Sequence, residues 1–186
     1  MKGIFFTELL EMAEREYGSQ AVDKIIPFLE AGDHGVFNAN MDYPYTQFHE
    51  LINRLADEVR IAPSDLTKIY GEYLFSRLII IYRPHFAGNS DIFEFLEQID
   101  YFIHVKLQAD FPHKGIPGFK AERISQNTFA VSYQSKYDLI DLAIGLFMGC
   151  QKFFNEDLTV NAEIKTEFDK EWVCISLNRS KVLTRA

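Results

Sequence analysis

The stretch that decides the fold is DIFEFLEQIDYFIHVKLQADFPHKGIPGF, residues 91–119. Apolar side chains recur every three or four positions over residues 91–111, which predicts an amphipathic helix with a wide hydrophobic face. Asp91 and Glu94 have the spacing of a capping box, so we expect the helix to begin there. His104 falls at the edge of the apolar face, where it either completes a hydrogen-bonded core or points into a pocket. The helix alone leaves both alternatives open.

The chain before this stretch has the pattern of four further helices. Amphipathic spacing predicts them at residues 1–17, 21–31, 48–60 and 63–82. Gly18 is expected to end the first helix, and Pro63 to begin the fourth. The segment between the second and third helices is predicted to be irregular until residue 45 or 46.

The chain after Pro117 changes to alternating patterns that predict strands. They are expected at residues 119–124, 128–134, 158–168 and 172–177, as two hairpins with turns at 125–127 and 169–171. Helical spacing returns between the hairpins, at residues 136–154. The order predicts an α+β fold, in which a helical N-terminal subdomain packs on a C-terminal subdomain with a four-stranded antiparallel sheet and helices. We expect one domain over residues 1–180, with a helical part at about 1–62, a helix-plus-sheet part at about 63–178, and a tail at 179–186.

Composition limits the classes of function. Of the 186 residues 47% are hydrophobic and 15% aromatic, which excludes a disordered chain and supplies enough rings to line a large planar cavity. The formal net charge of −8 leaves no basic surface for nucleic acid or an anionic membrane. The run LIIIY at 78–82 is too short to cross a bilayer, and charges interrupt the N-terminal segment too early for a signal peptide. We therefore expect a cytoplasmic protein.

Enzyme signatures are absent from the sequence. It has no GxSxG, P-loop, GxGxxG or HExxH motif, and its carboxylates are dispersed along predicted helix surfaces. Cys150 and Cys174 belong to no CxxC motif and are expected to be reduced, buried thiols. The other histidines are not spaced to share a metal with His104. We predict a protein without catalytic activity.

Two hydroxyl residues end the second predicted strand. Tyr133 and Ser135 lie two positions apart, so on an extended chain their side chains point the same way and offer two donors to an anion. They precede a predicted helix, whose N-terminus also favours negative charge.

In this combination the chain resembles the haem nitric oxide/oxygen binding (H-NOX) family, the bacterial relatives of the haem domain of soluble guanylate cyclase. The resemblance covers nearly the full length and is specific because its segments occur in one order and spacing. They are MKGI at 1–4, YGEYLF at 70–75, IHVKLQADFPHKGIPGF at 103–119, YQSK at 133–136 and IGLFMGCQKFF at 144–154.

The resemblance implies haem b bound between the two subdomains. His104 would be the proximal ligand, bonding iron through a neutral imidazole nitrogen and serving as the metal ligand. Pro117 would press against the porphyrin and hold it out of plane. Tyr133 and Ser135 would donate hydrogen bonds to the haem propionates.

The chain departs from the family at Tyr137, where the family has an arginine that pairs with a propionate. Losing a hydrogen bond to a charged group costs about 1.5–3 kcal/mol. Burial of roughly 500 Å² of porphyrin surface contributes about 12 kcal/mol before costs. We therefore expect weakened haem binding that is not abolished. The alternative that Tyr137 leaves open is a haem-less ligand- or protein-binding module with the same fold.

The family also indicates which residues face the bound gas. Its oxygen-binding members place a tyrosine donor at the position of Leu142, and the neighbouring positions Phe5, Leu9, Leu74 and Leu78 are apolar here. The resemblance thus implies a sensor that binds NO and CO at ferrous haem and excludes oxygen, although the same leucines would suit an ordinary core. Signal transduction would require a separate partner, by analogy a histidine kinase or a cyclic-di-GMP enzyme. A haem carrier or a redox enzyme is a further alternative, but no distal acid or base supports it.

Overall fold

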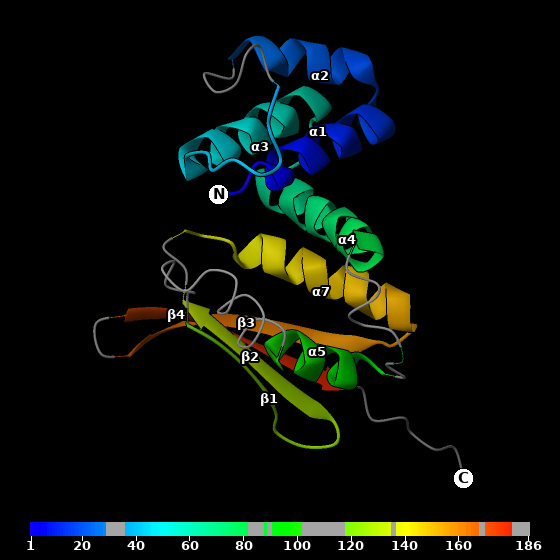
Figure 1. The fold of residues 1–186 in the computed structure, drawn as a ribbon, viewed down its shortest axis with the longest axis vertical. Coiled ribbons are helices and arrows are strands. Elements are labelled where there is room, and N and C mark those ends of the chain that lie inside the picture. Colours follow the sequence, from blue (N-terminus) through cyan, green and yellow to red (C-terminus); the bar gives the residue numbers. More distant parts are fainter. Residues whose placement is uncertain are drawn as a thin grey trace. The chain divides into compact units, whose positions relative to one another are not determined.

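The computed structural model describes residues 1–28, 36–81, 88, 91–101, 118–134, 137–167 and 170–179 (Figure 1). Its contacts divide the chain into two compact units. The first unit consists of Met1–Arg77 and Asp141–Leu146, and the second of Leu78–Ile140 and Phe147–Ala186.

The first unit is helical and has its own core. Its elements are α1 (Ile4–Tyr17), α2 (Ser19–Ile25), the 3-10 turn η1 (Ile26–Phe28), α3 (Tyr45–Val59), α4 (Pro63–Ile81, which belongs to this unit as far as Arg77) and the first half of α7 (Ile140–Phe154). Phe6 on α1 stacks on Phe37 with ring centroids 4.6 Å apart and meets Phe48 on α3 edge to face at 5.6 Å. Because these rings join α1, the loop before α3 and α3 itself, they fix how the two helices pack.

The first residues of the chain are tied to the loop before α3. Gly3 donates its amide to the carbonyl of Met41 at 2.8 Å, and Lys2 forms an isolated bridge with Asp42. A Cβ added at Gly3 would lie 1.9 Å from the carbonyl oxygen of Asn38, closer than any real contact. Glycine at position 3 is therefore required by the backbone that passes beside it.

Helices α4 and α7 touch at two glycines within the first unit. A Cβ at Gly71 would lie 2.5 Å from the carbonyl oxygen of Leu142, and a Cβ at Gly145 would lie 2.1 Å from that of Lys68. The two backbones approach each other without a side chain between them. This contact fixes the position of the first half of α7 on α4.

The second unit is built on an antiparallel sheet, as predicted. Its strand order is β1 (Phe119–Arg123), β2 (Thr128–Gln134), β4 (Lys170–Arg179) and β3 (Leu158–Glu167). In the central ladder Val131 of β2 faces Ile175 of β4, and both side chains are buried. Helix α5 (Ile92–Tyr101) packs beside β1, and its buried Phe93 lies 5.2 Å from the ring of Phe129 (Figure 1).

The predicted α+β fold with two hairpins is confirmed, and several element boundaries differ: the first helix begins at Ile4, α3 begins at Tyr45 and not at residue 48, and β4 continues to Arg179. The helix predicted at residues 21–31 begins at Ser19 and gives way to a 3-10 turn at Ile26, because Pro27 has no amide to continue it. The helix predicted from residue 136 begins at Ile140, whose amide is accepted by the Asp138 carboxylate. Residues 29–31 and 135–136 lie outside the described part.

A further difference is in the second hairpin. Its turn was expected to include residues 170 and 171, but both already pair with β3, Lys170 with Glu167 and Glu171 with Thr166. Charged residues do not interrupt an antiparallel ladder, because pairing uses only the backbone groups. Among the described helices, none has the length and apolarity needed to span a bilayer.

Candidate functional site

Four of the five apolar residues predicted to face a bound gas lie in the first unit. Leu9 on α1, Leu74 on α4 and Leu142 on α7 are buried, and Phe5 on α1 is half-buried. Leu78, also half-buried, is near the end of α4 and is assigned to the second unit.

Adjacent residues of α4 bring Phe5 and Leu142 to one region. The hydroxyl of Tyr70 donates to the carbonyl of Phe5 at 2.7 Å, and Gly71 contacts the backbone of Leu142. Leu74 follows Tyr70 by one helical turn, so it lies on the same side of α4. The structure therefore gathers Phe5, Leu74 and Leu142 around one stretch of this helix.

The hydroxyl of Tyr70 is close to this region, but it already donates its hydrogen bond to the Phe5 carbonyl. Tyr70 is fully buried, and burial, followed by the charge of Glu8, raises its pKa well above the ordinary value. The side chain is thus neutral, and its proton is used by the Phe5 carbonyl. The apolar residues gathered here offer no further side-chain donor, which suits a ligand that does not need one.

A partly buried ion pair joins α1 to α4 beside the same residues. Glu8 is only 7% exposed, and its Oε2 accepts Nε of Arg77 at 2.8 Å. Arg77 also approaches Glu11 at 3.4 Å. The carboxylates were expected to be dispersed along helix surfaces, so this pair was not predicted. The signal was available, because Glu8 lies within one turn of Phe5 and Met12 on the buried face of α1.

In the second unit, Tyr133 has a buried hydroxyl that has no partner among the described residues. Tyr133 is in β2 opposite Phe119 and Val173. Within the described residues its hydroxyl oxygen has no hydrogen-bond partner. Burial, with a smaller effect of Asp138, raises its pKa to about 12, so the side chain keeps its proton. An unsatisfied buried hydroxyl is costly, and an acceptor such as a carboxylate would remove that cost.

The remaining predicted site residues are exposed or lie outside the described residues. Tyr137, at the position of the family arginine, is 43% exposed in the bend before α7. His104, Pro117 and Ser135 lie outside the described residues.

Helix α5, which leads toward position 104, begins as predicted. Oδ1 of Asp91 accepts the amides of Phe93 at 2.8 Å and Glu94 at 2.9 Å. Burial alone would raise the pKa of Asp91, but the Glu94 amide and the charge of Arg179 outweigh it, and the pKa is lowered. Asp91 is therefore an ionised cap that fixes the first turn of the helix.

No cluster of three or more potential metal-ligating side chains occurs among the residues that the structure describes. Cys150 is a buried free thiol, and burial raises its pKa strongly, while Cys174 is a half-buried free thiol. Neither has the exposed, electropositive surroundings of a reactive cysteine.

Each unit, taken by itself, has features that suit a haem group. A planar, mostly apolar molecule with two carboxylates needs a buried hydrophobic wall and hydrogen-bond donors for its acids. Within the first unit, Leu9, Leu74 and Leu142 supply apolar surface. Within the second unit, the hydroxyl of Tyr133 is a donor that has no acceptor among the described residues. Tyr137 remains the one departure, because it cannot supply a positive charge.

Comparisons with known proteins identify the family. A family profile described as haem-NO-binding matches residues 2–162. The solved H-NOX protein from K. algicida, in its unliganded Fe(II) state, is 29% identical, with a TM-score of 0.80 and 98% of both chains covered. The H-NOX from Shewanella woodyi, solved with IWP-051 bound in the Fe(II)CO state, is 28% identical, with a TM-score of 0.81, covering 97% of this chain and 95% of that one.

A variant of the T. tengcongensis H-NOX has a TM-score of 0.83 at 19% identity, over 97% of this chain and 98% of that one, and shows the common fold alone. Comparison with curated proteins gives no match. H-NOX domains are haem-based gas sensors rather than catalysts. Because the family profile covers most of the sequence, the chain belongs to the haem-NO-binding (H-NOX) family.

Proposed function

We propose that this chain binds haem b and senses NO and CO at ferrous iron, excludes oxygen, and signals to a separate effector protein. The observation that carries the haem assignment is the buried, unsatisfied hydroxyl of Tyr133, which lacks an acceptor among the described residues. It occupies the position that the family uses for a propionate donor. When bound, the haem iron supplies a coordination position for a diatomic gas.

The residues of the chain would divide the remaining tasks. His104 would hold the iron through a neutral imidazole nitrogen, and Pro117 would contact the porphyrin face. Tyr133 and Ser135 would donate to a propionate, with Tyr137 in place of the family arginine. The site as a whole would then rely on hydroxyl donors where relatives use a guanidinium.

Gas selectivity would follow from the apolar residues around α4. Bound oxygen carries partial negative charge and gains most from a hydrogen-bond donor, whereas NO and CO need one far less. Leu142 offers none, and the Tyr70 hydroxyl is held by the Phe5 carbonyl. A missing hydrogen bond of about 1.4 kcal/mol lowers oxygen affinity tenfold. Phe5, Leu9, Leu74 and Leu78 would complete the apolar lining.

Signalling would require a change that a partner can recognise. His104 would be the residue that links the bound gas to the rest of the chain, and a partner that binds one of two states of the protein would respond. By family analogy the partner is a histidine kinase or a cyclic-di-GMP enzyme, and the chain itself is a cytoplasmic, non-catalytic sensor. We infer one domain over residues 1–180, because β4 continues the sheet to Arg179, beyond the residues matched by the family profile.

A second candidate is favoured by Tyr137 alone. Without the arginine, the same fold could serve as a haem-less module that binds a small molecule or a protein.

One experiment separates the two candidates. The purified protein is reduced, and its absorption spectrum is recorded without gas, with NO, with CO and in air.

We expect a haem Soret band that shifts with NO and CO and shows no stable oxygen complex in air. His104→Gly should lose the band unless imidazole is added. A colourless protein that takes up no added hemin would establish the haem-less module instead.

A further inference from the structure

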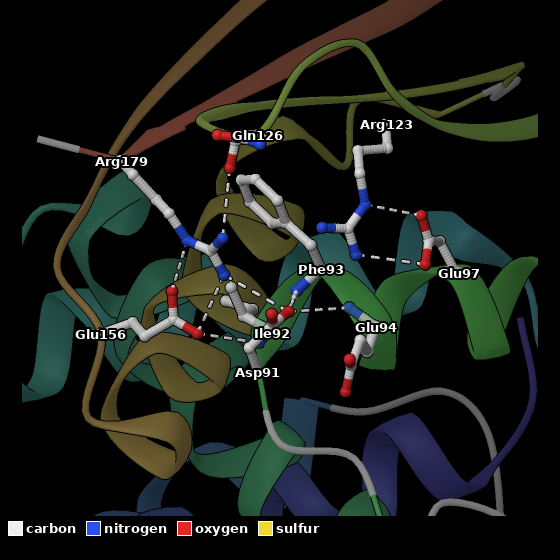
Figure 2. A network of polar contacts seen from close by, with 9 residues as sticks. All are labelled: Asp91, Ile92, Phe93, Glu94, Glu97, Arg123, Gln126, Glu156 and Arg179. Atoms are coloured by element: carbon white, nitrogen blue, oxygen red, sulfur yellow. Dashed lines mark hydrogen bonds and ion pairs between the residues drawn. The ribbon is translucent and has the colours of Figure 1, made fainter.

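The sheet of the second unit has two outer strands, and they differ in what lies beside them. Helix α5 packs beside β1, and Arg123 of β1 pairs with Glu97 of α5 at 2.8 and 3.2 Å (Figure 2). On the other side of the sheet, β3 pairs with β4 along its full length. Among the described strands, none pairs with the outer edge of β3, so this edge is where a further strand can add to the sheet.

The start of β3 is closed to a further strand. Leu158, its first residue, donates its amide to Oε1 of Gln151 at 3.0 Å. The cross-strand partner of Leu158 is Arg179, which donates from Nε to Glu156 at 2.8 Å. Glu156 in turn accepts the amide of Ile92, the first residue of α5, at 2.9 Å (Figure 2). Because these contacts hold the start of β3, a further strand can pair only with the rest of the edge.

The same end shows which backbone groups of β3 point outward. Leu158 and Arg179 face each other, but neither amide is used between them: one binds the side chain from α7, and the other binds the carbonyl of Asn127 at 2.8 Å. Opposite residues of an antiparallel ladder alternate between hydrogen-bonded and non-hydrogen-bonded pairs, and the register of β3 with β4 has no break. Every second residue from Leu158 onward therefore directs its amide and carbonyl away from β4. In the middle of the strand these residues are Ala162, Ile164 and Thr166.

The middle of β3 has an exposed apolar residue between two opposite charges. Ile164 is on the same face of the sheet as the buried Leu158, and it is 57% exposed although Val173, opposite on β4, is buried. Glu163 and Lys165 point to the other face, pair with each other at 2.7 Å, and have side chains that are more than half exposed. A strand added at this edge would cover the isoleucine and lie directly beside both charges.

We propose that the added strand is β3 of a second copy of this chain, paired antiparallel about a twofold axis at Ile164. In this register Ile164 faces its own copy and Ala162 faces Thr166, so the outward backbone groups of the two strands bond to each other. Glu163 of each copy faces Lys165 of the other as a non-hydrogen-bonded pair, with Cα atoms about 4.5 Å apart. The strand is thus complementary to itself in both backbone and charge.

Neighbouring registers lack this complementarity. Moving the axis by one residue keeps the outward backbone groups paired, but it places Glu163 opposite Glu163 in one direction and Lys165 opposite Lys165 in the other. Like charges directly opposite each other in a sheet are destabilising. The charges of β3 therefore select one register between two copies. Five paired residues on each chain make a small interface, so we expect a weak dimer with a Kd on the order of 0.1 mM.

Charge-reversal variants test this register. Glu163→Lys makes the charges at positions 163 and 165 both positive, and Lys165→Glu makes them both negative. The matched control is Lys120→Glu on β1, where Lys120 and Glu122 form the same kind of exposed pair two positions apart, at 2.8 Å. Because all these side chains are exposed, we expect the variants to fold, and circular dichroism checks it.

Sedimentation equilibrium measures the mass between about 10 µM and 1 mM protein. The buffer contains about 0.15 M salt, which screens charges beyond roughly 8 Å, so the net charge of −8 opposes association little while directly opposed pairs still interact. Wild type and Lys120→Glu should approach twice the monomer mass at the upper concentration. Each reversal variant alone should stay monomeric, and an equal mixture of the two should dimerise again.

Hydrogen exchange shows whether the dimer uses the proposed edge. For a Kd of about 0.1 mM, the share of free monomer falls about fourfold across this concentration range. The wild-type amides of Ala162, Ile164 and Thr166 should therefore exchange about fourfold more slowly at the upper concentration. Amides of these residues that are already protected in the monomer would overturn the inference, because another part of the chain would then cover the edge.

The other outcomes are equally definite. A wild type that stays monomeric at about 1 mM would overturn the inference, as would dimerisation of either reversal variant alone, a mixture that fails to associate, or an equal loss in Lys120→Glu. If a reversal variant does not fold, the double variant E163K/K165E replaces both, and it should dimerise with itself but not with wild type. None of these measurements requires haem or a gas, so the dimer is tested independently of the proposed function.

Discussion

Replacing Tyr133 by phenylalanine should change the haem-free and haem-loaded proteins in opposite directions. The substitution removes one hydroxyl and keeps the ring that β2 holds between Phe119 and Val173. In the haem-free protein this hydroxyl is buried without a partner in the described part, which costs about 1–3 kcal/mol. Tyr133→Phe removes that cost, so we expect the free energy of unfolding to rise by about 1 kcal/mol or more.

In the haem-loaded protein the same hydroxyl would donate to a charged propionate. A hydrogen bond to a charged group contributes about 1.5–3 kcal/mol, which corresponds to a roughly 10- to 150-fold change in an equilibrium constant. We expect Tyr133→Phe to release haem faster by about this factor. Urea unfolding of the haem-free protein and transfer of haem to an excess of a haem-scavenging apoprotein give the two numbers.

Tyr137→Phe is the matched control, because it removes a hydroxyl from a side chain that is 43% exposed. Its haem-free stability should change by less than about 0.5 kcal/mol. Loss of stability in haem-free Tyr133→Phe would show that the hydroxyl has a protein partner. Unchanged haem release would show that it does not bind the propionate. Either result would refute the reasoning from the unsatisfied hydroxyl.

Three further predictions concern selectivity, packing and pH. Leu142→Tyr restores a donor near the proposed gas position and should raise oxygen affinity about tenfold, measured by oxygen titration of the ferrous protein; an unchanged affinity would contradict the apolar-pocket argument. In a solvent-exposed helix, replacing glycine by alanine raises the free energy of unfolding by about 1 kcal/mol. In Gly145→Ala, however, the new Cβ would lie 2.1 Å from the Lys68 carbonyl oxygen, so we expect thermal unfolding to show a free energy of unfolding lower by about 2 kcal/mol. The pKa of Asp91 is lower in the folded than in the unfolded protein. Its ionised carboxylate therefore stabilises the fold at pH above its unfolded-state pKa of about 3.9, and this stabilisation is lost as the pH falls through the folded-state pKa. In urea unfolding, the free energy of unfolding of Asp91→Asn should therefore be lower than that of the wild type at pH 7, and the two values should converge in acid.

Local patterns in the sequence predicted much of the fold, because they act over a few residues. The cap at Asp91 could be predicted, since a carboxylate before an apolar run binds amides only two and three positions away. The alternation at residues 128–134 and 172–177 predicted the two strands in which Val131 and Ile175 face each other. The start of α7 was misplaced, because the contact of the Asp138 carboxylate with the Ile140 amide is a single side-chain contact that periodicity does not record.

Contacts between distant parts of the chain could not be predicted in this way. Glu8 and Arg77 are 69 positions apart, and only the crossing of α1 and α4 brings them together. Likewise, nothing in the local sequence of Arg179 indicates that it caps α5 through Glu156. For Tyr133 the spacing predicted a donor, but its burial depends on strands that join β2 only in the folded sheet.

The order of strands in the sheet also has a consequence for biosynthesis. β4 is made last, yet it lies between β2 and β3 and supplies the backbone partners of both. The pair Thr128 and Asn178 closes a loop of 50 positions, and until that happens the β1–β2 hairpin has one edge open. A ribosome-bound chain therefore cannot complete this sheet before its final strand emerges, and translation leaves an unpaired strand exposed to aggregation in the meantime.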